Sequence, residues 1–439
     1  MTGMQHYQDQ HTAHLRQRAS RDDSWLMALR QEAMDEFLKA GFPSSRQENW
    51  KYTDMTRLGG DPFQYTQGSA VSPFVEKLLT ADPAVNAQLV FVDGLLHRRI
   101  LSDALVGSGA VIDSLDAVYL SRRDEIQQLL KSTDAAGKHP FVALNTAFLS
   151  DGAYIRIPRG VHLEQPIHLV FLSGATSEPT VSHPRNVFVF EEGSSGTVVE
   201  HYLGPDGCAY FTNTRTEIHA GPGCLTNHYI VERQGDRGIH VGTVDILQDR
   251  DSTVHSHTFW LGGALVRNDL NVRFQGEHGS CRLEGLYLLA DKEHVDNHTR
   301  IDHDTPHCTS SQLYKGIMAD RSRGVFNGKV VVAQDAQKTD AEQTNRNLIL
   351  SPNARIDTKP ELEIYADDVL CSHGSTVGQI DMDALFFLRS RGIPEALARH
   401  MLTEAFASDL VDAVKNPELR EYIAELVQQR VARIEHRTE

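Results

Sequence analysis

The sequence predicts a mainly β protein in which a long series of short strands lies between two helical regions. From about residue 154 to residue 380, short β-rich runs alternate with Gly, Asn, Asp and Pro, and no convincing amphipathic helix interrupts them. Before and after this core, apolar residues recur at helical spacing. We therefore expect a mostly helical N-terminal region at 1–148, a β core at 149–380 and a helical C-terminal region at 381–439.

The strand pattern alone does not decide the architecture of the β core. Many short strands without helices are typical of a sandwich, a barrel, a propeller or a β-helix. The run is long, uninterrupted and irregularly spaced. A sandwich of this length usually divides into separate domains, so the pattern favours a β-helix.

Three elements are expected before the core. Apolar residues at helical spacing predict a helix at 24–39, which Gly41 closes. A second, single helix is expected at 115–131. Between them, the run QLVFVD at 88–93 predicts a strand that ends at Gly94.

After the core, caps and prolines mark three helices. Asp381 is a candidate N-cap for a short helix that stops at Gly392. Pro394 is expected as the first residue of the next helix, and Pro417 opens the last one. A helical unit of this size buries little apolar surface by itself. It must therefore pack on the β core, on a partner or on both.

Charge and hydropathy exclude several classes of partner. The chain has 43 Lys and Arg against 59 Asp and Glu, a net charge of −16. Nucleic acids and anionic membranes require cationic surface, so neither is an expected partner. No apolar run has the length of a membrane-spanning helix, and the polar start lacks the apolar core of a secretory signal. These features predict a cytoplasmic protein.

The cysteines do not form a disulfide framework. They are few, odd in number and widely spaced, at Cys208, Cys224, Cys281, Cys308 and Cys371. No C-x-x-C pair occurs, so a self-contained ferredoxin-like cluster or a zinc ribbon is not expected.

Cys371 and His373 are the sharpest candidate site. Side chains two residues apart in a strand point to the same face, so an extended backbone places this thiol and imidazole side by side. Both are good ligands for iron, zinc or copper. Two donors are too few for a tetrahedral metal or a cluster iron, so the others must come from elsewhere in the chain or from a partner. The alternative is a packed cysteine beside an ordinary surface histidine.

A histidine-rich segment offers a weaker candidate. The segment contains His294, His298, His303, His307 and Cys308. The spacing of His294 and His298 suits a metal only on a helix, whereas the surrounding composition is that of strands and turns. Polar residues of strand edges are therefore the favoured interpretation, and a stand-alone metal-binding protein is the alternative.

Enzymatic motifs are absent. The sequence has no G-x-x-x-x-G-K-[ST], no G-x-S-x-G and no H-E-x-x-H, and no pair of carboxylates stands out as an acid/base couple. We therefore expect no catalytic residue in this chain. A carbohydrate-active β-helix enzyme is the second alternative, by analogy of fold alone.

Four separated motifs carry a family resemblance. They are RQENWKYTDM at 46–55, LNTAFLSDGAYIRIPRGVHLEQPIHLVFLS at 144–173, NGKVVVAQDAQKTDAEQTNRNLILS at 327–351, and CSHGSTVGQID followed by FFLRSRGI at 371–393. With them the chain resembles the SufB/SufD family of the SUF iron–sulfur cluster assembly machinery. The H-G-x-T-x-G form at His373 and the E-x-W-K-Y-T segment are similar to its SufD branch.

The resemblance implies a right-handed parallel β-helix and a scaffold, not an enzyme. It implies that late β-helix strands pair with SufB and that the C-terminal helices receive SufC, an ABC-type ATPase. Cys371 and His373 fall on the family's interface positions, where the histidine supports cluster building beside a cysteine of SufB. The implied iron–sulfur cluster is transient, shared across the interface and not stably bound by the isolated chain. Self-pairing of the isolated chain as a homodimer stays open.

Overall fold

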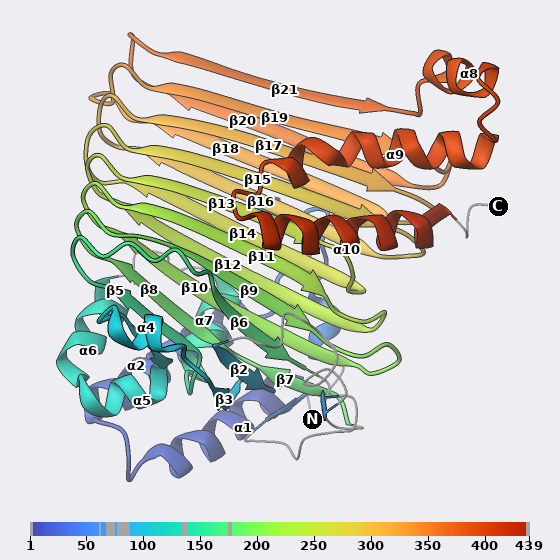
Figure 1. Ribbon diagram of the computed structural model, residues 1–439. Helices are drawn as coiled ribbons and strands as arrows, with labels where there is room; N and C mark the ends of the chain where they lie inside the picture. Colours follow the sequence, from blue (N-terminus) through green and yellow to red (C-terminus); the bar gives the residue numbers. More distant parts are fainter. Residues whose placement is uncertain are drawn as a thin grey trace.

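The computed structural model describes residues 3–60, 63–66, 75–76, 88–132, 139–173 and 178–435. Its core is a parallel β-solenoid in which the chain alternates between two sheets (Figure 1). Partners on neighbouring coils lie 29 residues apart through the middle of the solenoid, from Leu265 to His294 and from His294 to Arg323. The predicted mainly β fold with a β-helix core and flanking helices is confirmed.

Each sheet grows by one strand per coil. Sheet A runs in the order β4 (Val111–Ser114), β5 (Ala153–Ile157), β8 (Arg185–Phe190), β10 (Tyr210–Ala220), β12 (Gly238–Gln248), β14 (Leu265–Phe274), β16 (His294–His303), β18 (Arg323–Val332) and β20 (Arg355–Ile364), with β7 (Thr180–Ser182) beside β10 and β1 (Gln64–Tyr65) beside β7. Sheet B runs in the order β3 (Leu95–Arg99), β2 (Leu89–Val92), β6 (Ile167–Leu172), β9 (Ser195–Leu203), β11 (Leu225–Arg233), β13 (Thr253–Trp260), β15 (Ser280–Leu289), β17 (Thr309–Met318), β19 (Asp340–Ile349) and β21 (Leu370–Gly378). The pairs β2–β3 and β4–β5 at the first coils are antiparallel, and the later pairs are parallel.

Side chains alternate between the two faces of each strand and so contribute to two hydrophobic cores. In β15, Leu283 and Tyr287 belong to the apolar interior between the sheets. Leu286 and Leu288 point the other way and belong to the cluster beneath the C-terminal helices. One strand therefore packs on both faces, which a period of two residues allows.

Tight turns connect the strands. Asp251, Asp291 and Asp320 adopt positive φ angles of 59°, 55° and 55° between consecutive strands. Aspartate tolerates this left-handed conformation better than most side chains because its carboxylate can hydrogen-bond locally. Short polar turns of this kind explain why the core sequence alternates β-rich runs with Asp, Asn and Gly.

The N-terminal region packs on the first coils and along sheet A (Figure 1). Its helices are α1 (Gly3–Arg18), α2 (Ser24–Ala40), α4 (Asp103–Gly107), α5 (Leu115–Ser121), α6 (Arg123–Ser132) and α7 (Pro140–Ala147), with 3-10 turns at Glu48–Trp50 and Thr56–Gly59. The E-x-W-K-Y-T segment lies on the outer face of sheet A. The Arg267 guanidinium lies 4.3 Å from the centre of the Trp50 ring, and Thr53 donates a hydrogen bond to Asp296.

The single helix predicted at 115–131 is wrong, because the chain breaks at Arg122 between α5 and α6. Arg122 has φ −140° and ψ 52°, outside the helical region. The break allows Val118 of α5 and Ile126 of α6 to enter the same apolar cluster with Tyr154 of β5. Tertiary packing therefore overrides the local helical pattern.

The C-terminal helices begin at the end of β21 and fold back over sheet B (Figure 1). They are α8 (Met382–Ser390), α9 (Glu395–Asp412) and α10 (Pro417–Glu435). The predicted N-cap is confirmed, because the Asp381 carboxylate accepts from the amides of Asp383 and Ala384 at 2.8 and 3.1 Å. Pro394 has ψ 147° and precedes α9 instead of opening it, a shift of one residue.

None of the helices in the described part of the chain combines the length and apolar character that a bilayer crossing requires. All five cysteines are free thiols, as expected from their spacing.

Candidate functional site

The candidate pair lies on β21, the last strand of sheet B in the described chain. Cys371 is in register with Ala341 of β19, and His373 is in register with Gln343. In-register neighbours in a parallel sheet point to the same face, so the thiol and the imidazole share a face, as the alternation predicted. Ala341 and Gln343 are buried between the sheets. The pair therefore faces the interior side of the solenoid, at its open end.

The end of the solenoid is uncovered. Every residue of β21 is exposed except Cys371, which is partly buried. Leu370 and Val377 expose 73% and 50% of their surface. The backbone groups of β21 that point away from β19 form an open edge of the kind that pairs with another strand. The pair is thus accessible to solvent, and a second protein docked on this edge would cover it.

The thiol is not pre-activated in the free chain. Burial raises the pKa of Cys371, and the nearby Asp340 carboxylate raises it further. Thiolate, not thiol, is the usual metal ligand, and a bound cation is what favours its formation. His373 is exposed. The two side chains therefore offer one sulfur and one nitrogen donor, and no third donor from this chain joins them within the described residues.

Three further residues complete the surroundings of the pair. The hydroxyls of Ser375 on β21 and Thr358 on β20 lie 3.0 Å apart and connect the two sheets at the last coil. Gln343 lies directly beneath His373 and is fully buried. We call Cys371, His373, Ser375, Thr358 and Gln343 the terminal site. Sequence reasoning missed the last three residues. Strand alternation could have found Ser375, two residues after His373, whereas Thr358 and Gln343 lie on other strands and require the number of residues per coil.

The histidine-rich segment does not form a metal site. His294 accepts or donates a hydrogen bond with Thr53, and His298 pairs with Asp296, both on the outer face of β16. His303 faces the interior and bonds Ser310, while His307 stacks on His278 in a turn. Across the described ranges, no group of three or more His, Cys, Asp or Glu side chains is arranged to hold a metal ion.

A groove of about 440 Å³ crosses the outer face of sheet A and carries acidic side chains. Burial raises the pKa of Asp269, but the Arg267 guanidinium outweighs burial and holds it well below 3.8. Asp302 pairs with Arg300 at 2.8 Å, and Asp245 accepts from Asn271 at 3.0 Å. A glycosidase requires a carboxylic acid that stays protonated. Paired carboxylates of this kind do not support the carbohydrate-active alternative.

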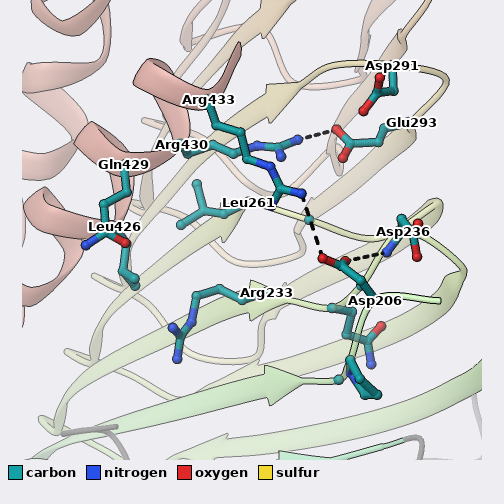
Figure 2. A pocket seen from close by; sticks show the side chains of 15 residues that line it. Asp206, Arg233, Asp236, Leu261, Asp291, Glu293, Leu426, Gln429, Arg430 and Arg433 are labelled. Carbon is teal, nitrogen blue, oxygen red and sulfur yellow. Dashed lines mark hydrogen bonds and ion pairs between the residues drawn. The ribbon is translucent and has the colours of Figure 1, made fainter. Parts of the chain in front are cut away.

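Figure 2 shows a second cleft, of about 420 Å³, between α10 and the turns of sheet B. Its charged side chains come from both sides and pair across it. The Arg430 guanidinium donates to Glu293 and, at 3.1 Å, to the carbonyl of Leu288, while Arg433 lies 3.8 Å from Asp206. The cleft is therefore a contact that holds α10 on the solenoid.

Exposed apolar side chains gather on the first C-terminal helices. Met382, Phe386 and Phe387 of α8 expose 63%, 73% and 56% of their surface, and Leu397 and Met401 of α9 expose 50% and 41%. An exposed apolar cluster of this kind marks an interaction surface. It follows directly after β21, so the terminal site and the apolar cluster are joined by a few residues.

Known proteins of one family are similar to most of this chain. A model of the SufBD core domain of the SUF system for iron–sulfur cluster assembly matches residues 171–406, and a model of the SufBD N-terminal region matches residues 1–169. The chain is 35% identical to the iron–sulfur cluster assembly protein SufD of Escherichia coli, over 91% of this chain and 92% of that protein. It is 34% identical to a SufBD family protein of Synechocystis, over 90% and 88%, and 24% identical to SufD of Bacillus subtilis, over 93% and 95%. The solenoid and these matches over nearly the whole chain lead to one conclusion: the protein belongs to the SufBD family of iron–sulfur cluster assembly proteins.

Proposed function

We propose that this chain is a non-catalytic scaffold subunit that contributes Cys371 and His373 to a cluster-building site shared with SufB. The observation that carries the proposal is the incomplete donor pair at an uncovered strand edge. The missing ligands must come from a surface that docks there, because no other suitable side chain of the described residues approaches. The iron–sulfur cluster is the cargo of this site, which releases it after assembly.

The edge of β21 supports pairing with a partner strand. Its exposed apolar side chains, Leu370 and Val377, add contact area beside the free backbone groups. A solenoid of the same kind in SufB would extend both sheets across the interface. The same edge supports a homodimer of the isolated chain, since a two-fold axis would let β21 pair with its own copy.

The apolar cluster on α8 and α9 supports docking of SufC. Nucleotide hydrolysis then belongs to that partner, in agreement with the lack of a phosphate-binding motif in this sequence. Asp381 connects β21 to α8, which carries part of the apolar cluster. Binding of the ATPase and docking of a partner on the terminal site would therefore take place on connected elements.

The proposal is tested with His373→Ala in the assembled complex under anaerobic reconstitution. The imidazole is exposed, so fold and assembly should persist while cluster formation falls about tenfold or more. His97→Ala is the matched control, because His97 is exposed on β3 at the opposite end of sheet B. Cluster formation at the normal rate in His373→Ala would refute the assignment.

A further inference from the structure

Gln343 is the buried residue closest in register to the proposed cluster ligand. It lies on β19 beside His373 of β21, and its side chain faces the solenoid interior with no exposed surface. Side chains in register on neighbouring parallel strands stack about 4.8 Å apart. The Gln343 amide therefore lies one strand beneath the imidazole, on the side that a docked partner would not cover.

The amide of Gln343 has no hydrogen-bond partner, although both of its polar atoms are buried. The next inward-facing residues of the same strand differ. The Asn345 amide donates to the Tyr287 hydroxyl at 3.2 Å and to the Tyr314 carbonyl at 3.1 Å, and Asn347 accepts from Tyr287 at 2.5 Å. Leaving a buried polar group unsatisfied costs about 1–3 kcal/mol, so an apolar residue would be the more stable choice here. This cost in stability indicates that the amide gains a hydrogen-bond partner only when the chain is in its complex.

Gly328 gives the amide its room. It lies across the interior on β18, and a Cβ placed on it would fall 2.1 Å from Nε2 of Gln343. No side chain other than hydrogen therefore fits at position 328 while Gln343 keeps its conformation. With neither polar atom fixed by a partner, the amide is free to turn toward the coil above it.

We propose that Gln343 is a positioning residue for His373 during cluster assembly. Its Oε1 accepts a hydrogen bond from one ring N–H of His373, which fixes the tautomer and leaves the lone pair of the other ring nitrogen free for iron. A hydrogen bond of this kind orients a ligating imidazole and raises its basicity. The amide is neutral, so it orients the ligand without adding charge to a site that must release its cargo. This inference rests on the proposed function of His373.

The test compares Gln343→Met with Gln312→Met in the assembled complex. Methionine keeps the length of the side chain and removes the donor and the acceptor. Gln312 is the matched control, because it is a buried glutamine one coil earlier in the same column, in register with Gln343 but not beside β21. Two readouts are measured: ferrous iron retained after gel filtration, and the ¹⁵N-histidine coupling of the reduced cluster by pulsed electron paramagnetic resonance.

Gln343→Met should retain iron about 10–100-fold less tightly and alter the histidine coupling, whereas Gln312→Met should change neither. Gln343→Glu, which keeps the acceptor, should restore the histidine coupling. A Gln343→Met complex with normal iron retention and coupling, or an equal loss in Gln312→Met, overturns the inference. His373→Ala, measured in parallel, separates the two levels: an unaffected His373→Ala overturns the proposed function and this inference together, and an impaired His373→Ala beside a normal Gln343→Met overturns this inference alone.

Discussion

Glu200 and Glu232 are both fully buried inside the solenoid, but their surroundings differ. The Glu200 carboxylate accepts from Asn186 at 2.8 Å, from Tyr202 at 2.5 Å and from Thr216 at 3.0 Å. Glu232 Oε1 accepts from the amide of Gln234 at 2.8 Å, while Oε2 has no partner. Burial raises the pKa of Glu232 to about 8, although the backbone amides of Gln234 and Gly262 and the Arg430 guanidinium act to lower it. A buried carboxyl without enough donors is held protonated.

Glu232→Gln should therefore change stability in a pH-dependent way. The folded pKa, about 8, lies above the ordinary 4.5, so between these values the folded protein holds a proton that the unfolded chain has lost. Its stability falls as the pH rises through this window. Glutamine mimics the protonated form, so the variant should match the wild type near pH 4.5 and exceed its free energy of unfolding by about 3–5 kcal/mol at pH 9. Urea unfolding at several pH values measures this.

The control for this prediction is Glu277→Gln, which changes an exposed carboxylate in a turn. It should shift the free energy of unfolding by less than about 0.5 kcal/mol at every pH. Glu232→Gln that is equally destabilising at both ends of the pH range would show that the carboxylate is ionised and partnered in the folded protein.

At the element scale, the C-terminal helices have one face fixed and another exposed. Leu410 of α9 and Val414, two residues after this helix, pack on outward-facing apolar residues of sheet B. Lys315 of β17 adds a directional contact, because its buried ammonium donates to the Phe406 carbonyl at 2.9 Å and to Asp409 at 2.5 Å. Apolar contacts alone permit sliding, whereas this contact fixes the rotation of α9. The apolar cluster on α8 and α9 therefore faces outward in a defined orientation.

Phe386→Ser tests that surface. Phe386 exposes 73% of its surface, so the change should leave the free energy of unfolding within about 0.5 kcal/mol. An exposed aromatic residue at the centre of an interface contributes about 2 kcal/mol or more to binding. We therefore expect at least about a tenfold loss of affinity for the ATPase subunit, measured by calorimetry.

Leu120→Ser is the comparison, because Leu120 of α5 is also exposed, at 47%, but lies far from α8. It should bind the ATPase as the wild type does. Unchanged binding of the proposed ATPase partner by Phe386→Ser would refute this docking surface.

At the scale of the whole molecule, the solenoid has one end covered and one end open (Figure 1). The N-terminal helices pack against the first coils, where β2–β3 and β4–β5 turn antiparallel. The last strand, β21, is instead exposed at every residue except Cys371. A parallel solenoid extends by adding strands, so an uncovered last coil is the position at which a second chain continues the sheets.

Val377→Pro should block this association without unfolding the chain. Leu370 donates its amide to the carbonyl of Thr339, just before β19, and amides of alternate residues in a parallel strand point the same way. The amide of Val377 therefore points to the open edge, where proline removes a donor that only a partner strand uses. We expect lost pairing with the partner at unchanged melting temperature, measured by sedimentation and calorimetry.

Thr376→Pro is the matched control. The amide of Thr376 points toward β19, so proline there breaks the ladder within the chain and should cost about 1–3 kcal/mol of stability. Normal pairing with the partner in Val377→Pro would show that β21 does not form the interface.

The sequence supported part of the terminal site and not the rest. Alternation along one strand was sufficient to place Cys371 and His373 on the same face. It did not tell which face is the interior, nor that Gln343, thirty positions earlier, lies beneath His373. The helix predicted at 115–131 failed for a related reason: a local pattern does not contain the packing partner that breaks it at Arg122.

Strand periodicity, turn residues and caps are encoded over a few neighbouring positions, so a β core between helices and a sulfur–nitrogen donor pair could be predicted without the structure. Register between coils depends on the length of every intervening turn and on how side chains stack across the interior. The tertiary structure alone therefore decided which strand is last, which residues surround the donors and which edge stays open. The physical reason is that these properties arise from contacts between residues far apart in the chain, and such contacts exist only after the coils have stacked.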